Sequence, residues 1–208
     1  MNLKFMTIKI VLLVFMHSLL FAQNTYYEDK LSQFEILNKY KKLDTAMIGD
    51  SITSRGLWSE LLDKSNIANR GIDGDTTDGL LNRIQSDKDS FKKVFLMIGI
   101  NDLLRGKDVE TVFRSYKKTI NFYKSKNTML VVQSTLYIYE KPPSSVNEKV
   151  KNLNILLEEY CKNNNVAYLD LNKELAPNGY LNPKYTNDRL HLNGKGYEIW
   201  ANVLKSLF

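Results

Sequence analysis

The chain has 208 residues, 43% of them hydrophobic, so it is long enough to bury the core of one domain. Its 29 Lys and Arg residues outnumber 23 Asp and Glu residues, which gives a net charge of +6 at pH 7. These charges are spread along the chain without a basic block or an aromatic-basic stripe, so we expect no nucleic-acid partner. The single cysteine, Cys161, excludes an intramolecular disulfide, and its apolar helical surroundings predict a buried core residue.

The first 22 residues do not resemble part of a folded domain. Two lysines precede an apolar stretch, Ile10–Ala22, which is too short to span a bilayer comfortably. This pattern predicts a secretory signal peptide over residues 1–22, with an uncleaved anchor as the alternative. No cysteine lies near the cut, which excludes lipid attachment at that point. We therefore expect residues 23–208 to form one periplasmic or secreted domain with no membrane span after signal cleavage.

Helical and strand patterns alternate through the rest of the chain. Apolar residues spaced three and four apart predict helices, and short continuous apolar runs predict strands that are covered on both faces. The predicted strands are Thr45 into Gly49, Ser65–Ala68, Lys93–Gly99, Thr128–Gln133 and Val166–Leu171. The predicted helices are an amphipathic one packed on the domain over Asn24–Lys42, Leu57–Leu62, one that Asp75 or Thr76 caps and that runs through Ile84, Val109–Lys126, Ser145 to about Asn163, and Asn193–Phe208. A loop-rich segment over Asn172–Asp188 follows the last strand. Five strands joined by helices predict an α/β protein, a three-layer α/β/α sandwich around a parallel sheet.

Chemically useful residues follow several of these strands. Ser51 comes directly after the first strand, at the sheet edge where α/β proteins bind ligands and where a helix begins. A serine nucleophile needs a base, and His191 is the only histidine outside the predicted signal peptide, because the other is His17. Asp188 lies three residues before His191, so a tight turn allows its carboxylate to hold one ring nitrogen while the other faces Ser51.

Acyl transfer also needs hydrogen-bond donors for the oxyanion of the tetrahedral intermediate. The N–H groups of Ser51 and Gly71 and the side-chain amide of Asn101 are the candidates after the first three strands. Taken singly, each candidate has an ordinary alternative as a turn or capping residue. Because all of them fall at the same sheet edge, we favour the joint interpretation as an acyl-transfer site.

Four segments resemble the sequence blocks of the SGNH hydrolases, also called the GDSL-type esterase/lipase family. They are Ile48–Thr53, Asn69–Gly71, Gly99–Asp102 and Asp188–Asn193. The resemblance implies a flavodoxin-like fold with a five-stranded parallel sheet and a serine esterase that needs no cofactor and no metal. It also implies the same roles for the residues named above, with Ser51 as nucleophile, His191 and Asp188 as its partners, and Ser51, Gly71 and Asn101 as the oxyanion hole.

Two residues depart from the family pattern. Ile52 replaces the leucine of the name-giving motif, a change seen in small esterase branches, and Arg189 stands where many relatives have glycine. Arg189 lies between Asp188 and His191, so it could lie near the substrate entrance.

The compact chain has no inserted lid domain, which predicts an open, shallow site for short acyl groups. We expect a small-molecule or glycan ester as substrate, with acetyl esters of carbohydrates favoured by resemblance to the platelet-activating-factor-acetylhydrolase-like and sugar-acetylesterase branches. The aromatic residues of the candidate rim loops either stack on sugar or pack in the core; they are Trp58, Tyr137, Tyr139, Tyr180 and Tyr185.

Two other functions stay open at this stage. One is a thioesterase or lysophospholipase for longer acyl chains, which would need an apolar groove lined by Leu103 and Leu104. The other is a catalytically inactive carbohydrate-binding module on the same fold, against which the complete set of serine, histidine and aspartate argues. The sequence leaves the natural ester, the substrate-binding residues and the oligomeric state open.

Overall fold

The computed structural model of the chain describes residues 25–39, 43–86, 91–141 and 145–208. The predicted signal peptide, residues 1–22, lies outside these ranges. The chain divides into two compact units, residues 1–40 and 41–208. In the first unit, a helix over residues 25–39 agrees with the predicted element, while its packing on the domain stays a prediction.

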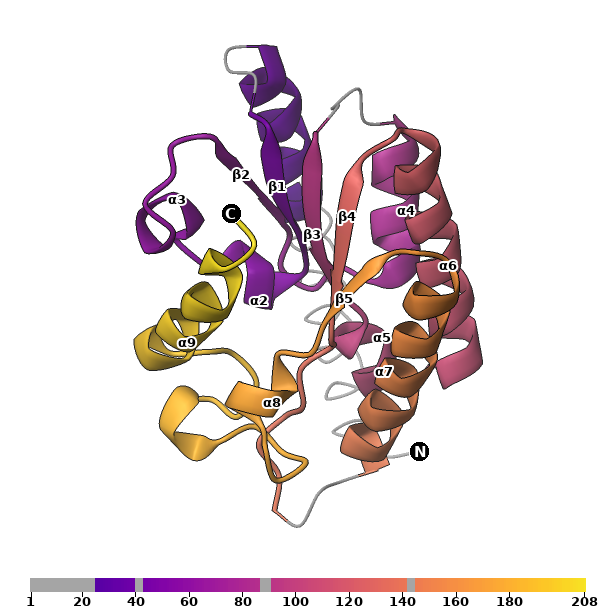
Figure 1. Cartoon of the computed structure of the whole chain (residues 1–208), viewed down its shortest axis with the longest axis vertical. Helices are drawn as coiled ribbons and strands as arrows, with labels where there is room; N and C mark the ends of the chain where they lie inside the picture. The colour runs from indigo at the N-terminus through magenta and orange to yellow at the C-terminus, as the bar shows by residue number, and fades with distance from the viewer. Residues whose placement is uncertain (1–24, 40–42, 87–90, 142–144) are drawn as a thin grey trace, which may run out of the picture. The chain divides into compact units, whose positions relative to one another are not determined.

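The second unit contains a five-stranded sheet in which every neighbouring pair of strands is parallel, with the order β2-β1-β3-β4-β5 (Figure 1). The strands are β1 (Thr45–Gly49), β2 (Ile67–Gly71), β3 (Lys93–Met97), β4 (Met129–Gln133) and β5 (Ala167–Leu169). The sequence order therefore reverses at β1, whose two neighbours are β2 and β3. This reversal point is where open parallel sheets form their ligand crevice.

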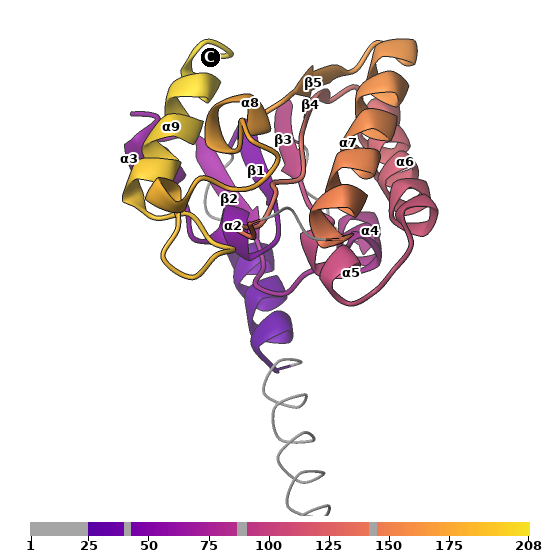
Figure 2. The same cartoon turned by 90° about the horizontal axis from the view of Figure 1, so that it is seen from below.

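Helices lie on both faces of this sheet, as the α/β/α prediction requires. Two short helices, α2 (Ser51–Ser54) and α5 (Ile100–Leu104), follow β1 and β3 almost directly. Figure 2 shows α4, α6 and α7 on one face and α3, α8 and α9 on the other. These six helices are α3 (Trp58–Leu61), α4 (Thr77–Ser86), α6 (Val109–Ser125), α7 (Ser145–Asn163), α8 (Asn172–Leu175) and α9 (Gly194–Lys205), and a short 3-10 helix, η1 (Pro183–Tyr185), precedes α9.

A cluster of aromatic rings connects α3 and α9. Trp58 and Trp200 pack edge to face with their ring centres 4.6 Å apart, and Trp58 Nε1 donates a 2.8 Å hydrogen bond to the carbonyl of Thr53. Trp200 Nε1 donates to Gln133 Oε1 at 2.7 Å. Trp58 is only 2% exposed, so of the two alternatives given for it, sugar stacking or core packing, the structure shows core packing. The cluster fixes α9, and with it the loop that carries His191.

The second strand begins and ends later than its apolar pattern predicts. It covers Ile67–Gly71 instead of Ser65–Ala68, because Asn69 pairs with Met47 and Gly71 pairs with Gly49 of β1. Pairing with a central strand outweighs the low strand preference of Asn and Gly. Gly71 is therefore the last residue of β2 and does not lie in a loop beyond it.

We predict that Gly71→Ala destabilises the protein by about 1–3 kcal/mol, the usual range for overpacking a filled site. A Cβ at this position would lie 2.2 Å from Ser54 N and 2.8 Å from the carbonyl oxygen of Asp50. Urea unfolding measures the change. The control is Gly194→Ala at the start of α9, where nothing lies within 4 Å of the added carbon. Equal effects of the two substitutions would contradict the assigned close contact.

Candidate active site

The nucleophile candidate lies at a sharp change from strand to helix. β1 ends at Gly49, Asp50 has an extended backbone, and α2 begins at Ser51. The Asp50 carboxylate caps α2 by accepting a 3.0 Å hydrogen bond from the Ile52 N–H. Because Ser51 is the first residue of the helix, the helix does not use its N–H, and no described residue accepts a hydrogen bond from it.

Ser51, His191 and Asp188 form one chain of hydrogen bonds. His191 Nε2 lies 2.9 Å from Ser51 Oγ, and His191 Nδ1 lies 2.6 Å from Asp188 Oδ2. If Nδ1 carries the proton and donates to Asp188, Nε2 can accept the proton of the serine hydroxyl. The structure thus brings together the three residues that the sequence analysis grouped, although 140 positions separate Ser51 from His191.

The turn around Asp188 fixes the orientation of the histidine. Asp188 Oδ1 accepts hydrogen bonds from the backbone N–H groups of Leu190 at 3.0 Å and His191 at 2.7 Å. Partial burial raises the pKa of Asp188, but the hydrogen bonds from the side chain and backbone of His191 and from the backbone of Leu190 outweigh it and hold the pKa well below its usual range. The carboxylate is therefore charged at neutral pH, as needed to stabilise a positively charged imidazole.

Asn101 and Gly71, the two oxyanion-donor candidates besides Ser51, differ in whether the structure leaves their N–H groups available. Asn101 lies in the first turn of α5, and its amide nitrogen donates one hydrogen bond to the Asp75 carbonyl at 3.0 Å. Its second amide N–H is left for a ligand. The Gly71 N–H instead donates to Asn69 Oδ1 at 3.0 Å, so its assignment as an oxyanion donor needs correction.

Gly74 is a donor candidate that the sequence analysis did not select. It follows β2 with a positive φ of 76°, a conformation that glycine adopts readily. Its carbonyl accepts a 3.0 Å hydrogen bond from Arg105 Nη2, whereas within the described ranges its N–H has no hydrogen-bond partner. The next residue, Asp75, holds Asn101, so the loop lies beside that amide. The repeated glycine and aspartate in Gly71–Asp75 were the only feature of the sequence that pointed to Gly74 as a donor.

A buried carboxylate fixes α5 against the start of α4. Asp102 is fully buried and accepts hydrogen bonds from Thr77 N at 2.8 Å, Thr77 Oγ1 at 3.0 Å and Lys107 Nζ at 2.9 Å. Since Asn101 precedes Asp102 and Asp75 lies two residues before Thr77, these contacts hold Asn101 at a fixed distance from the loop that contains Gly74.

A second buried ion pair joins the same loop to the sheet. Arg83 Nε lies 2.9 Å from Asp75 Oδ2, and Arg83 Nη2 donates to the carbonyls of Arg70 at 2.8 Å and Gly49 at 3.3 Å. One guanidinium therefore contacts the ends of β1 and β2 and the loop that follows β2. Removing one partner of such a pair leaves an uncompensated buried charge.

Asp50, which directly precedes the serine, has a strongly raised pKa. Burial is the main cause and raises its pKa to about 7, while the hydrogen bond from Ile52 N opposes the shift and the nearby charges of Asp75 and Asp102 add to it. Its second oxygen, Oδ2, has no hydrogen-bond partner among the described residues. Deprotonation thus places an incompletely compensated charge in the interior, next to Ser51.

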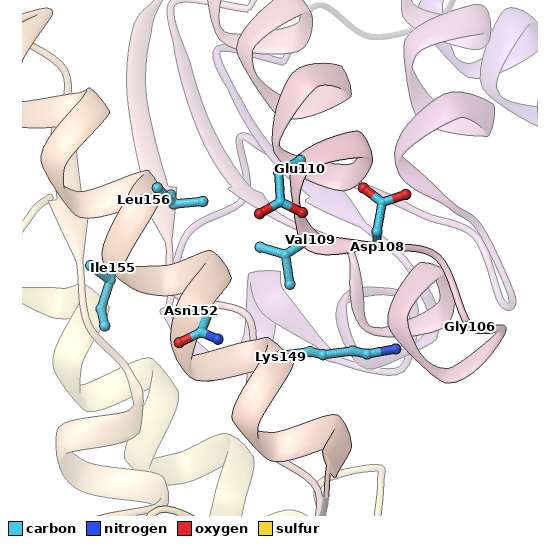
Figure 3. A pocket seen from close by; sticks show the side chains of 8 residues that line it. All are labelled: Gly106, Asp108, Val109, Glu110, Lys149, Asn152, Ile155 and Leu156. Carbon is cyan, nitrogen blue, oxygen red and sulfur yellow. The ribbon is translucent and has the colours of Figure 1, made fainter.

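A separate groove of about 580 Å³ lies between the start of α6 and the middle of α7 (Figure 3). Its lining includes Val109, Glu110, Lys149, Ile155 and Leu156, and none of the serine, histidine and aspartate described above. Across the residues the structure describes, no three His, Cys, Asp or Glu side chains are grouped as metal ligands. None of the described helices combines the length and the apolar character needed to cross a membrane.

A parallel α/β/α sandwich with hydrogen-bonded serine, histidine and aspartate at the carboxyl edge of its sheet defines the class of serine hydrolases. Residues 47–199 match the model of the GDSL-like Lipase/Acylhydrolase family, so the chain belongs to that family. The matched family is one of lipases and acylhydrolases, which are carboxylic ester hydrolases.

Two solved structures and one curated protein illustrate the similarity. A candidate platelet activating factor from Streptococcus pneumonia is 26% identical, with a TM-score of 0.85 over 93% of this chain and 98% of that one. The acetyl xylan esterase AlAXEase shares the fold at 20% identity and a TM-score of 0.68, over 78% of this chain and 98% of that one. The N-acylneuraminate cytidylyltransferase of Streptococcus agalactiae serotype V is 26% identical over 122 residues, 55% of this chain, and the match spans only 29% of that relative.

We predict that Asp50→Asn removes a pH-dependent loss of stability. The folded-state pKa of Asp50 is raised from 3.8 to about 7, so the folded protein retains a proton that the unfolded chain releases, and stability falls as pH rises between these values. Relative to wild type, the free energy of unfolding of Asp50→Asn should rise between about pH 4 and pH 7, by about 1.4 kcal/mol per pH unit, and level off above the folded pKa.

Urea unfolding at several pH values measures this difference. Glu158→Gln removes an exposed carboxylate from α7 and serves as the control, with a pH profile close to that of wild type. Parallel profiles of Asp50→Asn and wild type would contradict the assigned proton.

Proposed function

We propose that this enzyme hydrolyses esters of short acyl groups, acetyl esters first, with acetylated carbohydrate as the substrate class. The observation that carries the proposal is the hydrogen-bond chain from Asp188 through His191 to Ser51. We also propose that the enzyme is exported to the periplasm or secreted, on the signal-peptide pattern of residues 1–22.

In the proposed reaction, Ser51 Oγ attacks the ester carbonyl while its proton passes to His191 Nε2. The ionised Asp188 stabilises the positively charged imidazole that results. Collapse of the tetrahedral intermediate breaks the bond to the alcohol, which leaves with the proton from His191. Water then attacks the acyl-enzyme, again with His191 as base, and releases the acid and the free serine.

Three N–H groups would stabilise the oxyanion in this scheme. They belong to the backbone of Ser51, the backbone of Gly74 and the side chain of Asn101, whose other N–H is held by Asp75. Loss of one such donor commonly lowers the rate by roughly 10²–10³. The buried contacts of Asp102 and Arg83 would keep the loops that carry these donors in place before substrate binds.

The environment of the two leucines after Asn101 supports a short acyl group. Leu103 is 1% exposed and is part of the core, so of this pair only Leu104, at 43%, can contact a ligand. The groove of Figure 3 shares no lining residue with the triad. A thioesterase or lysophospholipase would need an apolar channel that begins at Ser51, and neither feature supplies one.

A carbohydrate substrate is supported by two partly buried aromatic residues. The rings of Tyr139 and Tyr180 lie 6.1 Å apart, and the backbone N–H of Tyr139 donates to the carbonyl of Arg189 in the triad turn at 2.8 Å. Tyrosine rings offer flat apolar faces with a polar tip, which suits sugar rings. The same fold accommodates acetylated xylan in the acetyl xylan esterase described above.

We predict that p-nitrophenyl acetate is hydrolysed much faster than p-nitrophenyl octanoate, and that Ser51→Ala lowers kcat for acetate at least about 10³-fold. Asp188→Asn should lower kcat by roughly 10³–10⁴, because it loses the charge that orients and stabilises His191. Release of p-nitrophenol measures both rates. Ser206→Ala, which removes an exposed hydroxyl after α9, is the matched control.

Faster hydrolysis of octanoate would favour the thioesterase or lysophospholipase alternative. The carbohydrate-binding module would be supported instead if wild type and Ser51→Ala hydrolysed both esters at equal rates and both still bound acetylated oligosaccharides.

A further inference from the structure

Arg189 occupies an unusual backbone position inside the triad turn. Its φ is +74°, in the left-handed region that residues with a side chain rarely adopt. The neighbouring Asp188 carboxylate fixes this turn through the N–H groups of Leu190 and His191. Glycine would fit the same backbone at lower cost, so a large cationic side chain here calls for a functional reason.

The side chain and backbone of Arg189 both contact Tyr139. The guanidinium carbon lies 5.8 Å from the centre of the Tyr139 ring, and the Arg189 carbonyl accepts a 2.8 Å hydrogen bond from Tyr139 N. A cation over an aromatic face is attracted by the ring and keeps its N–H groups free to bind at its edges. The charge is therefore held at an exposed position two residues from His191.

No described carboxylate pairs with the charge of Arg189. Arg55 is the other arginine at the triad turn, and it lies 3.4 Å from Asp73 and 3.8 Å from Asp188. Arg189 has no carboxylate within 4.0 Å in the described part of the chain. The exposed Glu140 and Lys141, which follow Tyr139, have opposite charges. An acidic group of a bound ligand could therefore pair with the Arg189 guanidinium.

We propose that Arg189, held on Tyr139, forms a subsite for a carboxylate on the alcohol part of the ester. This rests on the proposed function, in which His191 returns its proton to the leaving alcohol. The alcohol must then lie on the histidine side of Ser51, where the turn presents Arg189. A guanidinium binds a carboxylate through two parallel hydrogen bonds. The substrate class is therefore acetyl esters of sugars or small hydroxy acids that carry a carboxylate.

Three phenyl acetates that differ only in the group para to the ester test the subsite: 4-acetoxybenzoate, its neutral methyl ester and 4-acetoxyphenyl phosphate. The readout is the ratio of kcat/KM for each anionic ester to that for the methyl ester, compared between enzyme variants so that intrinsic reactivity cancels. In Arg189→Gly, whose backbone is free of strain, the benzoate ratio should fall about two- to fivefold, mainly through KM, as expected for an exposed charge pair. Arg189→Lys should retain part of the wild-type ratio.

Arg114→Gln removes an exposed positive charge from α6 and should keep the wild-type ratio. Raising NaCl from about 0.05 M to about 0.5 M should lower the wild-type ratio and leave that of Arg189→Gly nearly constant, because salt screens exposed charges.

Equal changes for all three esters in Arg189→Gly would overturn the subsite and leave Arg189 with a role in the turn only. An Arg189-dependent preference for the phosphate over the carboxylate would overturn the carboxylate assignment. Failure of the proposed function is distinguishable, because none of the esters would then be hydrolysed faster by wild type than by Ser51→Ala.

Discussion

The hydrogen bond between Ser51 Oγ and His191 Nε2 depends on two parts of the chain that are 140 residues apart. The end of β1 presents the serine, and the loop before α9 presents the histidine. The buried rings of Trp58 and Trp200 hold α9 in place, and Trp58 also donates to Thr53 within α2. The reactive contact therefore depends on packing in the interior as much as on the residues that form it.

Buried charges keep the rest of the site in position. Arg83 joins the ends of β1 and β2 to Asp75, and Asp102 joins α5 to α4. Both networks converge on the short loop after β2 and on Asn101. An oxyanion site is effective when its donors are oriented before the reaction, and charged groups with several hydrogen bonds are well suited to this. The strained, exposed Arg189 differs from these groups, since no carboxylate of the described residues lies within 4.0 Å of it.

The sequence was sufficient to predict the α/β class and the grouping of Ser51, Asp188 and His191. Continuous apolar runs identify central strands, and a single histidine outside the first 22 residues leaves one candidate base. The role of Gly71 could not be predicted, because only the pairing of β2 with β1 shows that this glycine ends a strand and that its N–H bonds to Asn69. The burial of Trp58 likewise depends on α9, which is distant in sequence. The signal peptide of residues 1–22 stays a prediction.

Labelling by a serine-directed fluorophosphonate probe, followed by mass spectrometry of peptides, tests the central claim most directly. The probe reacts with a serine only when a neighbouring base activates it, and it does not depend on the choice of ester. The account predicts one modified residue, Ser51, with labelling at least tenfold slower in His191→Gln. Modification of a different serine, or equal labelling rates in wild type and His191→Gln, would contradict it.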